Sequence, residues 1–139
     1  MDDDLVDGEE LIPSSGELLW RNAHPKFVDG DMISSQVFRV STLDLGKLST
    51  ARSTQIEAAA HFDEYTSDSN LESAGVWAVS VAEVDAQGVR VVGDVGVQDG
   101  FRRPTGHAYL DLRAKTRNGA KTLSSRLRAL AQCRGRIHP

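Results

Sequence analysis

The segment AGVWAVSVAE, at residues 74–83, decides how the rest of the chain must fold. Its middle is apolar without interruption, a pattern typical of a strand that is covered on both faces. Ser80 and Glu83 follow at the spacing of a capping box, in which each side chain accepts a hydrogen bond from a free amide at the start of a helix. The segment therefore predicts a buried strand over residues 75–80 and a short helix over residues 81–87.

Three more elements are expected after this segment. Residues 89–97 indicate a looser strand, interrupted by glycines. Residues 107–113 alternate between apolar and polar side chains, the pattern of a strand with one face in the core. Leucine and alanine recur at helical spacing over residues 120–134, and Gly135 is placed to end that helix.

The residues before the segment predict a less regular arrangement. A first strand that starts at Leu18 is cut short by Pro25, which fixes φ and lacks an amide hydrogen. Residues 33–40 are rich in β-forming side chains and predict a second strand. Thr54 opens another stretch with capping-box spacing, so a helix over residues 55–65 is expected.

Together these elements predict an α+β fold, in which two or three helices cover a small, mainly antiparallel sheet. The folded domain is expected to span residues 17–139. Residues 1–16 carry six acids and no base and end in a Pro-Ser-Ser-Gly run. Because this composition is too polar to repay the entropy of ordering, it predicts a disordered acidic N-terminal tail.

Charge is divided unevenly along the chain. Ten of the sixteen Lys and Arg residues follow position 100, whereas nineteen of the twenty Asp and Glu residues precede it. Such charge must be held apart, paired internally or offered to a partner. Our first hypothesis is a binding or accessory domain whose basic C-terminal face engages an acidic protein or a nucleic acid. The residues predicted for that face are Arg113, Lys115, Arg117, Lys121, Arg126 and Arg128.

Composition predicts the cellular location of the protein and the kinds of site that it lacks. Cys133 is the only cysteine, so no intrachain disulfide is possible and a cytoplasmic location is expected. The four histidines lack the close spacing of metal ligands, so neither a metal nor a cofactor is expected. No run approaches the roughly 20 apolar residues that span a bilayer, so no membrane association is expected. The oligomeric state stays open.

A small enzyme is the competing hypothesis. Arg21 and His24 lie close together in the run LLWRNAHP, and Ser34 and Ser35 open the next expected strand. The arginine would hold a phosphate or carboxylate, the histidine would transfer a proton and a hydroxyl would orient the ligand. His107, from a polar row that it forms with a tyrosine and an aspartate, would join them. Convergence of these five side chains on one pocket would support a catalytic site for a nucleotide-like anion, and their scatter would remove that support.

Several blocks of the chain resemble a group of small, uncharacterised bacterial proteins. This resemblance implies a stand-alone bacterial domain and brings no activity with it. Arg21 and the two serines that follow are also similar to the early arginine and hydroxyl residues of NAD-consuming ADP-ribosyltransferase and RES-type toxins. That similarity implies the enzyme alternative, although no acid follows Asp111 to match the late catalytic glutamate of those toxins. The blocks are Leu-Trp-Arg at 19–21, His-Pro at 24–25, Ser-Ser-Gln-Val-Phe at 34–38, Leu-Ser at 48–49 and Gly-His-Ala at 106–108.

Overall fold

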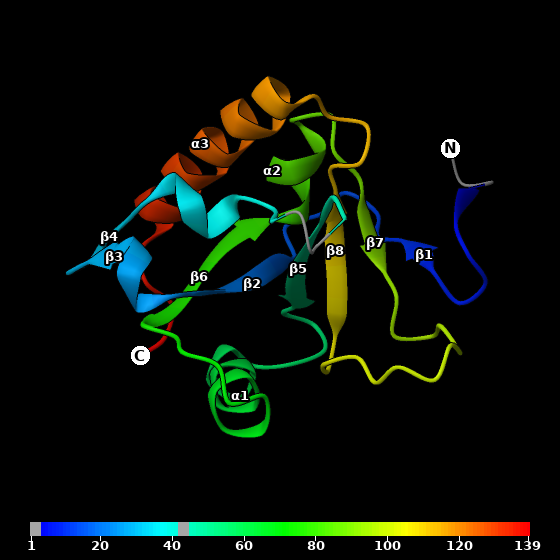
Figure 1. Cartoon of the computed structure of the whole chain (residues 1–139), viewed down its shortest axis with the longest axis horizontal. Helices are drawn as coiled ribbons and strands as arrows, with labels where there is room; N and C mark the ends of the chain where they lie inside the picture. The colour runs from blue at the N-terminus through cyan, green and yellow to red at the C-terminus, as the bar shows by residue number, and fades with distance from the viewer. Residues whose placement is uncertain (1–3, 42–44) are drawn as a thin grey trace.

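One antiparallel sheet organises the molecule. The computed structural model describes residues 4–41 and 45–139, and its main sheet has six strands in the order β1-β7-β8-β5-β2-β6 (Figure 1). Every neighbouring pair in it is antiparallel, and β3 and β4 form a separate small sheet. The prediction of an α+β fold with a mainly antiparallel sheet is thus confirmed. The strands are β1 (Glu10–Leu11), β2 (Leu18–Ala23), β3 (Val28–Asp29), β4 (Met32–Ile33), β5 (Lys47–Arg52), β6 (Gly75–Ser80), β7 (Val91–Gly93) and β8 (His107–Asp111).

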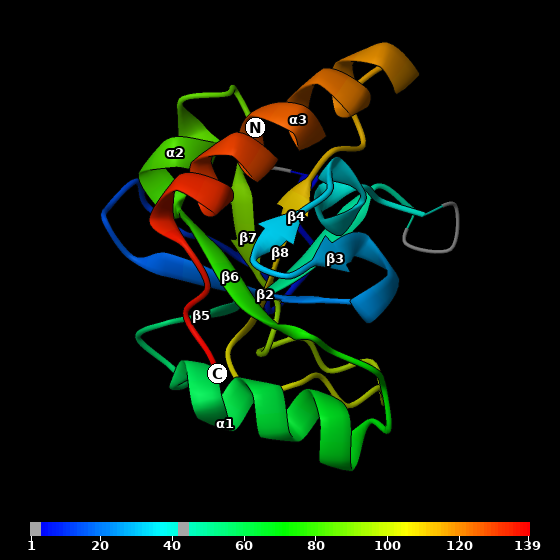
Figure 2. The ribbon, with the colours of Figure 1, turned by 90° about the vertical axis from the view of Figure 1, so that its left-hand side faces the viewer.

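Helices cover both faces of this sheet. α2 (Val81–Asp85) and α3 (Arg117–Arg134) lie on one side, and α1 (Ala58–Asp63) lies on the other (Figure 2). Within the described ranges, no helix is long and apolar enough to cross a membrane. Shorter helical segments are the π-helix Glu64–Asp68, which continues α1, and the 3-10 turns Pro25–Phe27 and Ser35–Phe38.

Strand β6, from the segment at residues 74–83, lies at the centre of the core. All six residues of β6 are buried. Trp77 belongs to the cluster on the α3 face, which also contains the fully buried Leu127. Val76 belongs to the cluster on the α1 face, with Trp20 and Phe62. Coverage from both sides is the reason that this strand is apolar throughout.

Capping hydrogen bonds set the boundaries of the two helices on the α3 side. Ser80 Oγ accepts a hydrogen bond from the Glu83 amide at 3.0 Å, and Glu83 Oε1 accepts one from the Ser80 amide at 2.7 Å, so the predicted capping box is confirmed. Thr116 Oγ1 accepts from the Gly119 amide at 3.0 Å, which starts α3 three residues before the predicted position. The helix ends as predicted at Gly135, whose φ is 90°.

One local prediction is wrong and the start of one helix differs from its prediction, and hydroxyl hydrogen bonds explain both. The segment expected to be a strand over 33–40 is mostly a 3-10 turn, because Ser34 Oγ accepts a hydrogen bond from the Gln36 amide at 3.2 Å. The helix expected over 55–65 begins only at residue 58. Its expected cap, Thr54, instead donates its hydroxyl hydrogen to the Glu17 carboxylate.

The N-terminal residues differ from the disordered tail that composition predicts for 1–16. Glu10–Leu11 forms β1 along the edge of β7, and the Ile12 amide donates to the Val91 carbonyl at 2.9 Å. The Ile12 side chain is buried in the core. We call residues 4–12 the N-terminal strap; residues 1–3 lie outside the described part of the chain.

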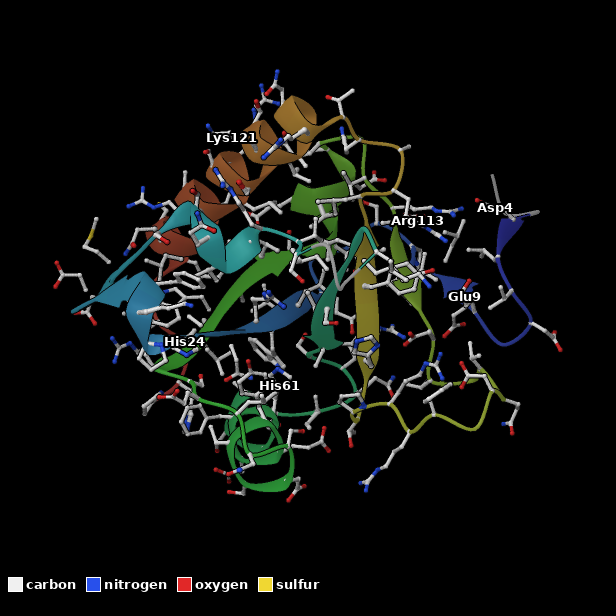
Figure 3. All side chains as sticks on the ribbon, viewed as in Figure 1. Asp4, Glu9, His24, His61, Arg113 and Lys121 are labelled. Atoms are coloured by element: carbon white, nitrogen blue, oxygen red, sulfur yellow. The ribbon has the colours of Figure 1, made fainter. Side chains whose placement is uncertain are left out.

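The acids of the strap are held by donors on the sheet. The Tyr109 hydroxyl donates to Glu9 at 2.7 Å, and Asp4 pairs with Arg90 at 2.9 Å. Figure 3 shows Glu9 and Asp4 on the side of the sheet where Arg113 lies. These contacts help to offset the entropy cost that composition alone assigns to ordering this segment.

The sheet opens between β2 and β5, and this opening positions the candidate site. The two strands pair only where Leu19 meets Arg52 and Trp20 meets Ala51, whereas β2 pairs with β6 over its whole length. Beyond these pairs the strands diverge (Figure 1). We call this region the sheet split.

Arg21 bridges the sheet split. Its Nε donates to the Val37 carbonyl at 2.8 Å, and its Nη1 donates to the Ser49 carbonyl at 2.9 Å. The guanidinium thus reaches from β2 to a carbonyl of β5 and to a carbonyl of the 3-10 turn Ser35–Phe38, and these bonds fix its orientation beside the opening.

Candidate functional site

A pocket of about 250 Å³ lies beside the sheet split. At about 30 Å³ for each water molecule, this volume is room for about eight waters. Residues of β2, β5 and β8 form one wall, and α1, the π-helix and the loop after it form the other. The lining residues are Arg21, Asn22, Ser49, Thr50, His61, Tyr65, Ser69, Leu71, Pro104 and His107.

The most chemically specific feature of the pocket is a histidine held by a buried carboxylate. His107, at the start of β8, has its Nδ1 at 2.7 Å from Asp94 Oδ1, and Asp94 is only 6% exposed. Asp94 Oδ2 lies 3.2 Å from the Nε of Arg103. The carboxylate is therefore held from both sides, between an imidazole and a guanidinium.

Asp94 is ionised at neutral pH. Burial by itself raises the pKa of this carboxyl, but the hydrogen bonds and charges of His107 and then Arg103 hold its pKa below the ordinary value. An ionised Asp94 favours the His107 tautomer that carries its hydrogen on Nδ1. In neutral His107, the lone pair is then on Nε2.

His61 supplies a second imidazole to the pocket. It projects from α1 towards β2 (Figure 3) and is 8% exposed. Burial lowers its pKa to about 4, with the charges of His107 and Arg21 acting in the same direction and that of Glu64 opposing them. The ring is therefore neutral at pH 7, and its buried Nδ1 has no hydrogen-bond partner among the described residues.

Asn22 adds another buried polar group to the pocket wall. Its Oδ1 accepts a hydrogen bond from the Ser73 hydroxyl at 2.7 Å, whereas its Nδ2 has no partner within the part of the chain that the structure describes. A buried donor without a partner costs about 1–3 kcal/mol. Asn22 therefore leaves one buried donor unpaired at the pocket wall among the described residues.

The π-helix Glu64–Asp68 closes the pocket on the α1 side. π-Helical segments are rare and occur frequently at functional sites. The Glu64 carboxylate accepts hydrogen bonds from the Thr105 amide at 2.9 Å and the Thr105 hydroxyl at 2.8 Å. These bonds tie the π-helix to the loop that leads into β8, so the wall containing Tyr65 is linked to the strand that carries His107.

Two of the five residues predicted for a catalytic site lie in this pocket, Arg21 and His107. His24 lies outside it: its Nδ1 accepts from the Lys26 amide at 3.1 Å, and its Nε2 is 3.5 Å from Glu72. Ser34 caps a 3-10 turn and Ser35 is the first residue of that turn, so neither serine reaches the pocket. The structure therefore does not bring these three residues together with Arg21 and His107.

Sequence reasoning missed His61 and Asp94. His61 lies one helical turn before Tyr65, a spacing that places both on one helix face and was available as a signal. Asp94 follows the short strand β7, and no spacing in the sequence connects it to His107. Their contact arises because β7 pairs with β8.

The polar row of His107, Tyr109 and Asp111 does not form a relay. Tyr109 is 1% exposed and its hydroxyl donates to Glu9 of the strap. Asp111 instead pairs with Arg90 at 2.9 Å and with Arg113 at 2.8 Å. The strap thus buries a residue that alternation alone assigns to the exposed face.

Four of the six residues predicted for a partner surface are engaged within the chain. Arg113 pairs with Asp111 at 2.8 Å, and Arg128 Nε donates to the Ile33 carbonyl at 2.8 Å. Lys115 Nζ lies 3.4 Å from the Gln87 carbonyl, and Arg126 Nη1 donates to the Gln87 side chain at 3.1 Å. Much of the C-terminal positive charge is therefore used internally.

The other two, Arg117 and Lys121, border an open hollow of about 890 Å³ together with Arg39. No ion pair of these three side chains occurs among residues 4–41 and 45–139. The basic surface predicted from the sequence is thus reduced to this smaller group.

No group of three or more His, Cys, Asp or Glu side chains in the described ranges could hold a metal ion. Comparisons with protein-family models, with curated proteins and with solved structures found no match to this chain.

The low pKa of His61 predicts a pH dependence of stability. Because its pKa is about 4 in the folded state and 6.5 otherwise, the unfolded chain binds the proton more tightly between these values. Stability is complete above about pH 6.5 and falls as the pH is lowered towards 4. At 1.36 kcal/mol for each pKa unit, the loss by pH 4.5 is about 2–3 kcal/mol.

Urea unfolding of the natural chain and of His61→Gln at pH 7 and pH 4.5 measures this effect. Carboxylates titrate in both proteins, so the difference between the two isolates His61. We expect the stability advantage of the natural chain to shrink by this amount at the lower pH. An unchanged difference would contradict the burial of a neutral His61.

Proposed function

We propose that this protein is a small enzyme that binds a polar ligand in the pocket beside the sheet split and uses His107 as a general base. The observation that carries the proposal is the 2.7 Å contact between His107 Nδ1 and the buried Asp94. A carboxylate in this position fixes the tautomer of a histidine and stabilises the imidazolium that forms when the ring accepts a proton.

In the proposed reaction, His107 Nε2 accepts a proton from a hydroxyl, either of the ligand or of a water molecule beside it. The imidazolium then returns the proton to the ligand or to solvent, so that His107 can act again. Asp94 remains ionised and balances the positive charge on the ring. Arg21 lies in the same wall and would hold a negatively charged oxygen of the ligand.

The enzyme proposal differs in its residues from the site expected from the sequence. It keeps Arg21 and His107, replaces His24 with His61 and adds Asp94. The serines that resemble those of the ADP-ribosyltransferase and RES-type toxins take no part in it.

A fragment screen followed by NMR tests the proposal. Protein labelled at histidine is mixed with small polar compounds, and the ring signals of His61 and His107 are recorded. We expect binders to move both signals while leaving His24, which lies outside the pocket, unchanged. Each binder is then incubated with the protein, and its products are followed in the same spectra. Hits that move only residues remote from the pocket, or a screen without any hit, would contradict the proposal.

A second candidate function rests on the hollow bordered by Arg39, Arg117 and Lys121. Three cations around one open surface support binding of phosphates along a nucleic acid. An acidic protein would be attracted to the same charges. This candidate keeps the first hypothesis made from the sequence and narrows its surface.

Reversal of Arg117 and Lys121 to Glu tests this second candidate. If both residues contact duplex DNA, we expect weaker binding and a slope of log affinity against log salt that is flatter by about 1.8, at about 0.9 for each phosphate. Arg126→Glu is the matched control, because Arg126 lies on the same helix outside the hollow. Fluorescence anisotropy at several salt concentrations measures the slope. Equal slopes for the double variant and the control would exclude nucleic acid from this surface.

A further inference from the structure

We infer that the ligand of the pocket is a small monocarboxylate with an apolar body, and not a nucleotide or a phosphate ester. This inference rests on the proposed function, because it names the substrate class of the same site. It is carried by the size of the pocket, the charge of its walls and the division of those walls into polar and apolar parts.

Size sets the first limit. A volume of about 250 Å³ lies below the roughly 300–1,000 Å³ of pockets that take drug-sized ligands. Room for about eight water molecules corresponds to a ligand of about ten non-hydrogen atoms. A nucleotide is about twice that size or more, so most of it would lie outside these walls.

Charge sets the second limit. Among the residues that the structure describes, Arg21 is the only Arg or Lys that lines the pocket, and no Asp or Glu lines it. His61 is neutral at pH 7 because burial lowers its pKa to about 4. One guanidinium without a carboxylate beside it in the lining matches a single negative charge, whereas a phosphate monoester carries nearly two at this pH.

The orientation of Arg21 favours a carboxylate at that end of the pocket. Its Nε and Nη1 are held by the Val37 and Ser49 carbonyls at 2.8 and 2.9 Å, so the plane of the guanidinium is fixed before a ligand arrives. Planar guanidinium and carboxylate groups pair with well-defined geometry. Asn22 lies in the same wall and His61 in the wall opposite, and each has one buried nitrogen without a hydrogen-bond partner among the described residues.

The remaining wall favours an apolar body. Leu71 and Pro104 line the pocket together with the ring of Tyr65, and these surfaces would cover a hydrocarbon or aromatic group. His107 lies in the same lining, so a hydroxyl between the carboxylate and the apolar body would meet its Nε2. A hydroxy acid with an apolar substituent has all three of these features.

Four probes of known chemistry test the inference. Mandelate carries a carboxylate, a hydroxyl and an aromatic ring; mandelamide replaces the carboxylate with a neutral amide. Phenyl phosphate has a similar size and nearly twice the charge, and adenosine monophosphate represents a nucleotide. Each is titrated into the natural chain at pH 7, and dissociation constants are taken from the ring signals of His61 and His107.

We expect mandelate to bind at least about tenfold more tightly than the other three probes, the factor that corresponds to about 1.4 kcal/mol. In Arg21→Gln this preference over mandelamide is expected to disappear. Arg128→Gln is the matched control, since Arg128 also donates to a backbone carbonyl, at 2.8 Å, but lies outside the pocket. Because the preference is measured on the natural chain, the test does not depend on the folding of Arg21→Gln.

Tighter or equal binding of mandelamide, phenyl phosphate or the nucleotide in the pocket would overturn the inference and leave the proposed function standing. If neither these probes nor any fragment of the screen moves the ring signals, both the inference and the proposed function fall. The two failures are therefore distinguishable.

Discussion

Replacement of His107 with Gln is expected to lower the turnover of any substrate found for the pocket by about 10²–10⁴-fold, the usual contribution of a general base. Glutamine is polar and of similar size, but its side chain does not accept a proton at neutral pH. The affinity for the same ligand is expected to change little, because His107 acts on the hydroxyl and Arg21 holds the charge. Turnover and affinity are measured separately, by product formation and by NMR titration.

His24→Gln is the control for this experiment. It makes the same chemical change in a histidine that lies outside the pocket, and we expect full turnover. Asp94→Asn is the companion variant: it leaves His107 in place and removes the negative charge that holds its Nδ1 hydrogen. We expect its turnover to fall as well, with a changed pH profile. Unchanged turnover in His107→Gln would reject the general base while leaving open binding in the pocket.

Local patterns in the sequence predicted the elements whose residues decide their own structure. The strand over 75–80 is buried on both faces, and its apolar run shows this without any knowledge of neighbours. The capping box at Ser80 and the glycine at 135 act over three or four residues, so their effects are equally visible. For these elements, the spacing of residues in the sequence was sufficient to predict the structure.

The candidate site was predicted only in part because its residues meet through long-range pairing. Arg21 and His107 were selected by residue type. Asp94, in contrast, contacts His107 because β7 pairs with β8. His61 lies on α1, which forms the opposite wall of the pocket. The pocket itself exists because β2 and β5 separate after two residue pairs. Nothing in either strand alone indicates where the two stop pairing.

The division of charge along the chain shows the same limitation. The sequence shows that most acids precede position 100 and most bases follow it. It does not show whether the two groups contact each other in the folded protein. In the structure, acids before position 100 contact bases after it, as Asp31 does with Arg136 at 3.3 Å and Glu83 with Arg134 at 2.9 Å. The N-terminal strap is a further example of long-range contacts that composition does not reveal. Its acids, which predict disorder, accept hydrogen bonds from Arg90 and Tyr109 on the sheet.

Removal of residues 1–12 is expected to lower the free energy of unfolding by about 3–5 kcal/mol. Burial of the Ile12 side chain contributes about 2 kcal/mol of this. The backbone hydrogen bonds between β1 and β7, with that from Ile12 to Val91, contribute about 1 kcal/mol each. Urea unfolding measures the loss. An unchanged midpoint would mean that the strap contributes nothing to stability, as a disordered tail would.

Gly8 allows the contribution of the strap to stability to be tested with a single substitution. Gly8 has a φ of +93°, and a Cβ added there would lie 2.3 Å from the Gly96 carbonyl oxygen, closer than atoms approach. Gly8→Ala therefore forces apart two backbone segments, and we expect a loss of more than about 2 kcal/mol. Gly100→Ala is the matched control: its φ is +83°, no atom lies within 4 Å of the new Cβ, and only the backbone cost of about 1 kcal/mol is expected. Gly96 is two residues from Asp94, so displacement of the strap is also expected to alter the ring signals of His107. Equal losses in the two variants, with unchanged His107 signals, would show that the strap neither supports this loop nor positions Asp94.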